Sequence, residues 1–98
     1  MPTYVALISW TDQGIKSYKD TIDRAEAAGQ LAGKVGATLE QTYWTLGPYD
    51  VVGILEAPDD ESATAFALAL SSQGNVRTTT MRAFDEVQMK EIVAKAGG

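Results

Sequence analysis

Cysteine and histidine are both absent from this chain of 98 residues. Without cysteine the protein can form no disulfide, build no Cys-based zinc site and use no thiol nucleophile. Without histidine it can build no histidine-based catalytic triad, and with neither residue it cannot hold a haem iron through a proximal His or Cys. We therefore expect no metal ion and no cofactor.

Positive charge and long apolar segments are also scarce. Eight Lys and Arg residues stand against 13 Asp and Glu residues, which gives a net charge of −5. The basic residues are scattered rather than clustered as phosphate-backbone binding requires, so we expect no nucleic-acid partner. No apolar run approaches the ~20 residues that span a bilayer, and the start of the chain lacks the features of a signal peptide. These absences predict a cytoplasmic protein that does not bind membranes.

The residues that are present are typical of a folded domain. Hydrophobic residues make up 45% of the chain and charged residues 21%, and the length suits a single domain covering 1–98. β-Forming segments predict strands at 3–10, 37–46, 50–57 and 75–84. Capping residues and apolar periodicity predict helices from Thr11 or Asp12 to Gly36, from the acidic run 59–61 to Gly74, and a short one after Asp85.

This β-α-β-β-α-β order predicts an α+β, ferredoxin-like fold: a four-stranded antiparallel sheet with helices on one face, plus a short C-terminal helix. In the first helix, apolar residues recur every three or four positions from Ile15 through Tyr18 and Ile22 to Val35. That spacing predicts one continuous amphipathic helix with these residues on its buried side.

The sheet is apolar on both faces, although its helices suffice to cover only one. In the strand at 3–10, one side carries Tyr4, Ala6, Ile8 and Trp10, and the other carries Val5 and Leu7. In the strand at 50–57, Val51, Gly53 and Leu55 lie on the side opposite Val52 and Ile54. A face that met water would alternate to polar residues. We therefore expect a homo-oligomer, a dimer or higher, that associates through the open sheet face, or a bound small molecule that covers it. The alternative is a monomer shielded by its C-terminal helix.

The segment 43–52 (Tyr-Trp-Thr-Leu-Gly-Pro-Tyr-Asp-Val-Val) predicts two strands joined by a tight turn, since Pro48 has the φ that a turn requires. Together with the runs 11–15, 56–61 and 74–78, it resembles the GYD-domain family, whose namesake element corresponds to Gly47, Tyr49 and Asp50. The resemblance covers essentially the whole chain. It implies a ferredoxin-like fold related to the dimeric α/β barrels of small bacterial proteins, a group of monooxygenases, haem enzymes and ligand-binding modules. It implies no established reaction.

No residue is predicted to be catalytic, and eight are candidates for ligand binding: Trp10, Tyr43, Trp44, Tyr49, Asp50, Asn75, Arg77 and Arg82. Tyr49 and Asp50 fit either an aromatic pocket or ordinary turn chemistry, and turn chemistry explains them without a ligand. Arg77 and Arg82 fit either a carboxylate or phosphate site, or ion pairs with acidic residues such as Glu40 and Glu56 on neighbouring strands or across a subunit interface. The acidic run 59–61 is interpreted as a helix cap rather than a cation site.

Three functions remain open. The first is a non-catalytic oligomer that binds a small molecule or a partner protein at the aromatic end of its sheet. The second is a cofactor-independent monooxygenase or isomerase acting on an aromatic substrate, as the family resemblance allows. The third is an anion or nucleotide sensor that uses Arg77 and Arg82, although the chain has no glycine-rich phosphate loop.

Overall fold

The computed structural model describes residues 1–97, so the last residue of the predicted domain, Gly98, lies outside it. Its elements in chain order are β1 (Thr3–Trp10), α1 (Asp12–Lys16), η1 (Tyr18–Asp20), α2 (Thr21–Lys34), β2 (Thr38–Trp44), β3 (Val51–Glu56), α3 (Asp60–Ser72), β4 (Val76–Ala83) and α4 (Glu86–Lys95). The four strands lie in the order β2-β3-β1-β4, and every neighbouring pair is antiparallel. The ferredoxin-like α+β prediction is therefore confirmed, with each strand boundary within two residues of its expected place.

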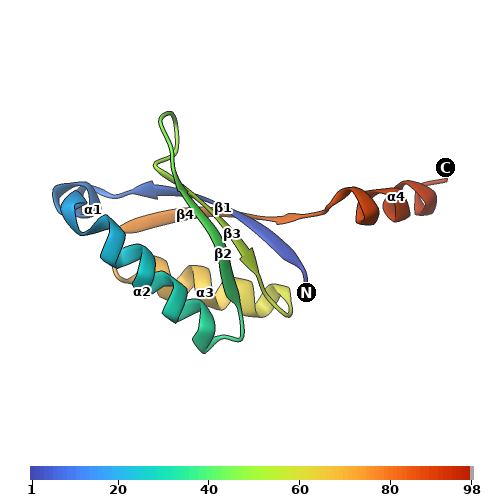
Figure 1. Ribbon diagram of the computed structural model, residues 1–98, viewed down its shortest axis with the longest axis horizontal. Coiled ribbons are helices and arrows are strands. Elements are labelled where there is room, and N and C mark those ends of the chain that lie inside the picture. The colour runs from blue at the N-terminus through green and yellow to red at the C-terminus, as the bar shows by residue number, and fades with distance from the viewer. Residues whose placement is uncertain (98) are drawn as a thin grey trace.

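Helices α2 and α3 lie side by side against one face of the sheet (Figure 1). Between them and the sheet lies the core, where Leu55 and Ala32 are fully buried and Tyr4 and Phe66 are 4% exposed. Burial alternates along β3 and along the first half of β1, and the buried side chains are the ones turned toward the helices. No helix within residues 1–97 is both long enough and apolar enough to cross a membrane.

The first helix is not continuous as predicted. The chain leaves helical geometry at Ser17, passes through the 3₁₀ turn η1 and begins α2 at Thr21. As a result Ile15, Tyr18 and Ile22, expected on the buried side, are 47%, 55% and 56% exposed. The break arises because α1 is held against the turn before β4. The sequence does not mark it, because the apolar residues keep their spacing of three and four positions across the break.

Helix α4 extends away from the rest of the molecule and covers neither face of the sheet (Figure 1). It contains no buried residue, and Val87, Met89 and Val93 are about half exposed or more. The predicted cap at Asp85 is confirmed: its carboxylate accepts a hydrogen bond from the Gln88 amide, and the Gln88 side chain accepts one from the Asp85 amide. Helix α4 therefore does not provide the shielding that the monomer alternative requires.

Candidate functional site

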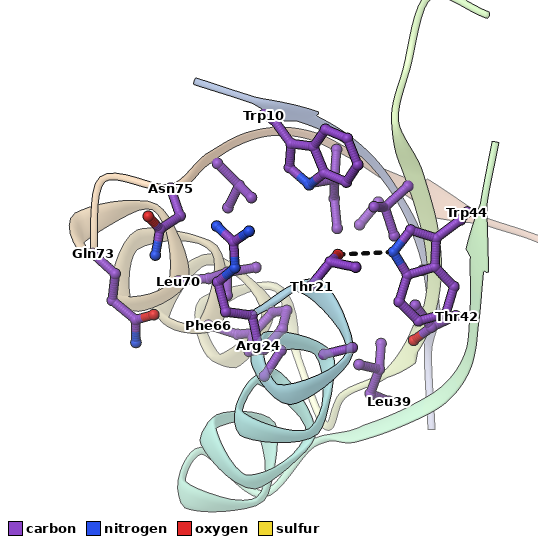
Figure 2. A pocket seen from close by; sticks show the side chains of 17 residues that line it. Trp10, Thr21, Arg24, Leu39, Thr42, Trp44, Phe66, Leu70, Gln73 and Asn75 are labelled. Atoms are coloured by element: carbon purple, nitrogen blue, oxygen red, sulfur yellow. Dashed lines mark hydrogen bonds between the residues drawn. The ribbon is translucent and has the colours of Figure 1, made fainter. Parts of the chain in front are cut away.

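A cavity of about 70 Å³ lies between the helix-facing side of the sheet and the helices α2 and α3 (Figure 2). Its wall is mostly apolar and includes Ile8, Phe66 and Leu70. Of the residues singled out from the sequence, Trp10, Trp44 and Asn75 line it together, although they come from three different strands or strand ends. The structure thus brings three of the eight candidates to one place.

Both ends of this cavity are built by side-chain hydrogen bonds. On one side the indole Nε1 of Trp44 donates to Oγ1 of Thr21 over 2.9 Å, which ties β2 to the start of α2 (Figure 2). On the other side the amide Nε2 of Gln13 donates to Oδ1 of Asn75 over 2.9 Å. The Asn75 side chain therefore has its oxygen occupied, while its Nδ2 remains available as a donor.

A glycine makes the close approach of α1 to this end of the cavity possible. A Cβ on Gly14 would lie 2.0 Å from the carbonyl oxygen of Asn75, a distance that no side chain tolerates. Thr11 completes the junction, because its hydroxyl donates to the Gly74 carbonyl over 2.6 Å and accepts from the Gly14 amide over 3.1 Å. The position of Asn75 is thus set by the packing of α1.

Arg24 lines the cavity, although it was not among the candidates named from the sequence. A charged residue is expected on the solvent-facing side of an amphipathic helix, but the guanidinium of Arg24 points into the cavity (Figure 2). Its Nη2 donates to the carbonyls of Gly14 and Ser17 over 3.1 and 2.8 Å. Its Nε and Nη1 are shielded from solvent and have no hydrogen-bond acceptor among residues 1–97. The helical spacing contained the signal, since Arg24 precedes the buried Ala28 and Ala32 by four and eight positions.

Tyr49 and Asp50 do not line the cavity. The Asp50 carboxylate accepts a hydrogen bond from the Trp10 amide over 2.8 Å, and its own amide donates to the Ile8 carbonyl over 2.9 Å. Thr45 closes the loop, donating from its hydroxyl to the Tyr49 carbonyl over 2.7 Å and from its amide to the Asp50 carbonyl over 2.9 Å. In this arrangement both residues of the motif take part in backbone contacts around the hairpin.

The two candidate arginines lie on opposite faces of β4, because five positions separate them and side chains alternate along a strand. Arg82 lies beside a groove of about 430 Å³ between α3 and β4, with its guanidinium 4.5 Å from the centre of the Phe84 ring. Arg77 lies on the open face, opposite Ser9 of β1. One small anion cannot contact both. Within residues 1–97, neither forms an ion pair with Glu40 or Glu56.

Carboxylates at the start of α3 have structural partners. Asp59 caps the helix by accepting from the Ser62 amide over 2.8 Å, and this bond holds the pKa of Asp59 below its ordinary value. Asp60 accepts a 2.5 Å hydrogen bond from the Tyr4 hydroxyl. That bond, with burial of the phenol, raises the pKa of Tyr4 to about 12. The predicted cap is confirmed at Asp59.

The open face of the sheet has an apolar centre that no helix of residues 1–97 covers. Strand register places Leu7 beside Val52 and Val5 beside Ile54, and all four side chains are partly exposed. Around them lie two larger and more exposed apolar side chains, Tyr43 at 54% and Met81 at 45%. Tyr43 thus lies on the opposite side of β2 from Trp44.

Charged groups occupy two diagonal corners of this open face. Glu40, at a β-bulge in β2, lies beside Glu56 of β3. The neighbouring Glu56 carboxyl, through a shared hydrogen bond and its charge, raises the pKa of Glu40. Arg77 lies near the opposite end of the face on the far edge strand. The face therefore carries an acidic corner and a basic corner.

Comparison with solved structures supports the fold. The chain resembles a crystal structure of a protein from Thermus thermophilus, with 25% identity and a TM-score of 0.57. The match covers 87% of this chain and 95% of the other. It also resembles two proteins of Mycobacterium tuberculosis, each at 15% identity: the leucine response regulatory protein, with a TM-score of 0.65, and a feast or famine regulatory protein complexed with L-methionine, with 0.66. These matches cover 86% and 87% of this chain but only about half, 51%, of each regulator.

Sequence comparison identifies the family. A protein of Thermus thermophilus, named glutamine synthetase and cystathionine beta-lyase binding protein, is 31% identical over 97% of this chain and 98% of its own length. The family model of the GYD domain matches residues 4–93. This confirms the resemblance drawn from the runs 11–15, 43–52, 56–61 and 74–78, and the chain belongs to the GYD domain family.

Proposed function

We propose that this protein is a non-catalytic binding module that forms a homodimer through its open sheet face and binds a partner protein in the bacterial cytoplasm. The observation that carries the proposal is the apolar centre of the open face, where Val5, Leu7, Val52 and Ile54 have no cover from the part of the chain that the structure describes. Contiguous apolar patches of this kind are uncommon on monomers and typical of interfaces. A second copy offers a cover of the same shape and chemistry.

The charges at the corners of the face favour a second copy as that cover. A two-fold axis in the plane of the interface, perpendicular to the line joining the corners, brings each acidic corner onto the basic corner of the other copy. Glu40 and Glu56 of one subunit would then face Arg77 of its partner. In a single subunit the two carboxylates repel each other, so the dimer relieves that repulsion.

A dimer of this kind leaves the hairpin tip free for a partner protein. The loop between β2 and β3 projects beyond the sheet (Figure 1), and its Leu46 is fully exposed, at 105%. An exposed leucine on a loop that is tied by hydrogen bonds at Thr45 is suited to insert into a pocket of a partner. Because the relative is named for binding glutamine synthetase and cystathionine beta-lyase, we propose the corresponding enzymes of the source organism as partners.

The other two functions have less support. An oxygenase or isomerase would need its proton-handling groups beside the substrate, whereas Tyr43, Tyr49 and Asp50 lie outside the cavity that Trp10 and Trp44 line. An anion sensor built on Arg77 and Arg82 would need both guanidiniums on one face of β4.

Isothermal titration of the purified enzymes into this protein tests the proposal. We expect the wild type to bind at least one of the two enzymes, and Leu46→Ser to weaken binding by about tenfold or more. Leu68→Ser is the matched control, because Leu68 is also exposed, at 68%, but lies on α3 away from the tip. If neither enzyme binds, or if Leu46→Ser and Leu68→Ser behave alike, the proposed partner surface is wrong.

A further inference from the structure

Arg24 carries a positive charge into surroundings that do not neutralise it. A guanidinium stays protonated in proteins, and an unpaired charge in an apolar site is unfavourable. The two carbonyls that accept from Nη2 carry only partial charge. No Asp or Glu lines the cavity, and no carboxylate of residues 1–97 forms an ion pair with Arg24. The three N–H bonds on Nε and Nη1 lack an acceptor.

The surroundings of Arg24 combine one positive charge with donors and apolar walls. Asn75 lines the same end of the cavity as Arg24 and has its Oδ1 occupied by Gln13, so it offers a donor rather than an acceptor (Figure 2). The rest of the wall is apolar, with Trp10, Phe66 and Leu70 around the open space. Such a wall suits a ligand with one anionic end and an apolar body.

We propose that this cavity binds a small monocarboxylate, with its carboxylate against Arg24 and Asn75 and its apolar body against Trp10, Phe66 and Leu70. The carboxylate would supply acceptors for the free N–H groups of Arg24, and charge-assisted hydrogen bonds are among the stronger ones. Because Nε and Nη1 are shielded from solvent in this structure, binding requires the guanidinium to turn on its flexible side chain toward the carboxylate. This proposal rests on Arg24 and the cavity, so it is independent of the partner-protein proposal.

The size of the cavity limits the apolar body. Its volume of about 70 Å³ is roughly half of the ~150 Å³ cavity that admits benzene, and it must hold the carboxylate as well, which indicates a body of about two or three carbon atoms. A short-chain acid such as propanoate fits this description.

The charges of the wall discriminate against two other classes of anion. An amino acid would bring an ammonium group beside Arg24, where no carboxylate is available to pair with it. A phosphate would bring a second negative charge into an apolar space that holds a single guanidinium. The uncharged alcohol of the same shape would leave the N–H groups of Arg24 without an anionic partner.

Titration calorimetry with propanoate, alanine and 1-propanol tests the proposal, because these compounds share a carbon skeleton and differ in charge. We expect propanoate to bind the wild type, and alanine and the alcohol to bind at least about tenfold more weakly. Arg24→Gln should weaken propanoate binding by about tenfold or more, since it removes the charge but keeps donors. Lys34→Gln, which alters a basic residue exposed on the same helix, should bind as the wild type does.

A spectroscopic readout on the unmodified protein keeps the test independent of how well Arg24→Gln folds. The chain has two tryptophans, and both line the cavity, so propanoate should shift both indole N–H resonances in a nitrogen–proton correlation spectrum. The proposal is overturned if propanoate moves neither resonance at about 10 mM. It is also overturned if alanine binds as tightly as propanoate, or if a folded Arg24→Gln binds propanoate as the wild type does.

Discussion

The Asp50 carboxylate accepts a 2.8 Å hydrogen bond from the backbone amide of Trp10, 40 positions earlier in the chain. This bond extends the pairing of β1 and β3 beyond its last register pair, Ile8 with Val51. The aspartate of the family's namesake element thus fastens the base of the hairpin to the end of β1. No ligand is needed to explain its presence.

The first prediction concerns this bond. Asp50→Ala leaves the Trp10 amide without its acceptor and should lower the free energy of unfolding by about 1–3 kcal/mol. Asp50→Asn keeps an oxygen acceptor and should lose less. Urea denaturation followed by tryptophan fluorescence measures both. Equal stability of wild type and Asp50→Ala would show that the bond contributes nothing to the fold.

The second prediction concerns the alkaline titration of Tyr4. Its hydrogen bond to Asp60 and its burial raise its pKa to about 12, above the ordinary value of about 10. Because the folded pKa is the higher one, this contribution to stability is fully present below pH ~10 and is lost as the pH rises through ~12. Tyrosinate absorbance should therefore resolve one of the four tyrosines as titrating last.

Tyr4→Phe should remove that late step, whereas Tyr18→Phe, which alters a tyrosine that is 55% exposed, should leave it in place. If the late step survives in Tyr4→Phe, the assignment of the raised pKa to Tyr4 is incorrect.

The third prediction compares two glycines. An added Cβ at Gly14 would clash with the backbone of Asn75, so Gly14→Ala should destabilise the protein by about 1–3 kcal/mol. An added Cβ at Gly29, inside α2, meets no atom within 4 Å, so Gly29→Ala should stabilise it by about 1 kcal/mol. For a domain of this length, that gain corresponds to a rise in Tm of about 4–8 °C. Thermal melts of both variants should move in opposite directions, and a shared direction would contradict the packing described for α1.

The fold could be predicted from the sequence because local signals agreed with the final arrangement. β-Forming runs separated by glycine and proline predicted the strands, and Asp59 and Asp85 marked the starts of two helices. The break at Ser17 could not be predicted, because it depends on contacts between α1 and the turn before β4. The extended position of α4, in which no residue of the helix is buried, could not be predicted either, because a local sequence pattern does not specify the surface against which a helix packs.

The candidate site was only partly predictable. Trp10, Trp44 and Asn75 were named from the sequence and do line one cavity. Arg24 was missed because a charged residue is expected to face solvent, although its spacing of four positions from Ala28 places it on the buried side of the helix. The opposite placement of Arg77 and Arg82 followed from strand alternation alone and was available from the sequence.

The fourth prediction concerns the pH dependence of association. Glu56 raises the pKa of Glu40 in a single subunit. Above that raised pKa, Glu40 carries a negative charge beside Glu56, and the two carboxylates repel each other. Arg77 of a second copy would favour the ionised pair, so the dimer binds the deprotonated form better and releases protons on association. Dimer affinity should therefore rise as the pH increases from about 4 to 7.

Sedimentation equilibrium across that range measures the effect. Arg77→Gln should flatten the rise, and Arg82→Gln, on the other face of β4, should not. A flat profile in the wild type, or an undiminished rise in Arg77→Gln, would argue against the diagonal pairing of charges.

The most direct test of the central claim, self-association through the open face, is the native mass of the wild type and of Val52→Lys. The account predicts twice the chain mass of 10.5 kDa for the wild type. It predicts the mass of one chain for Val52→Lys, because this variant places a charge in the apolar centre of the face. It predicts the wild-type mass for Leu68→Lys, because Leu68 is exposed elsewhere on the molecule. A wild type that stays at 10.5 kDa up to about millimolar concentration would contradict it.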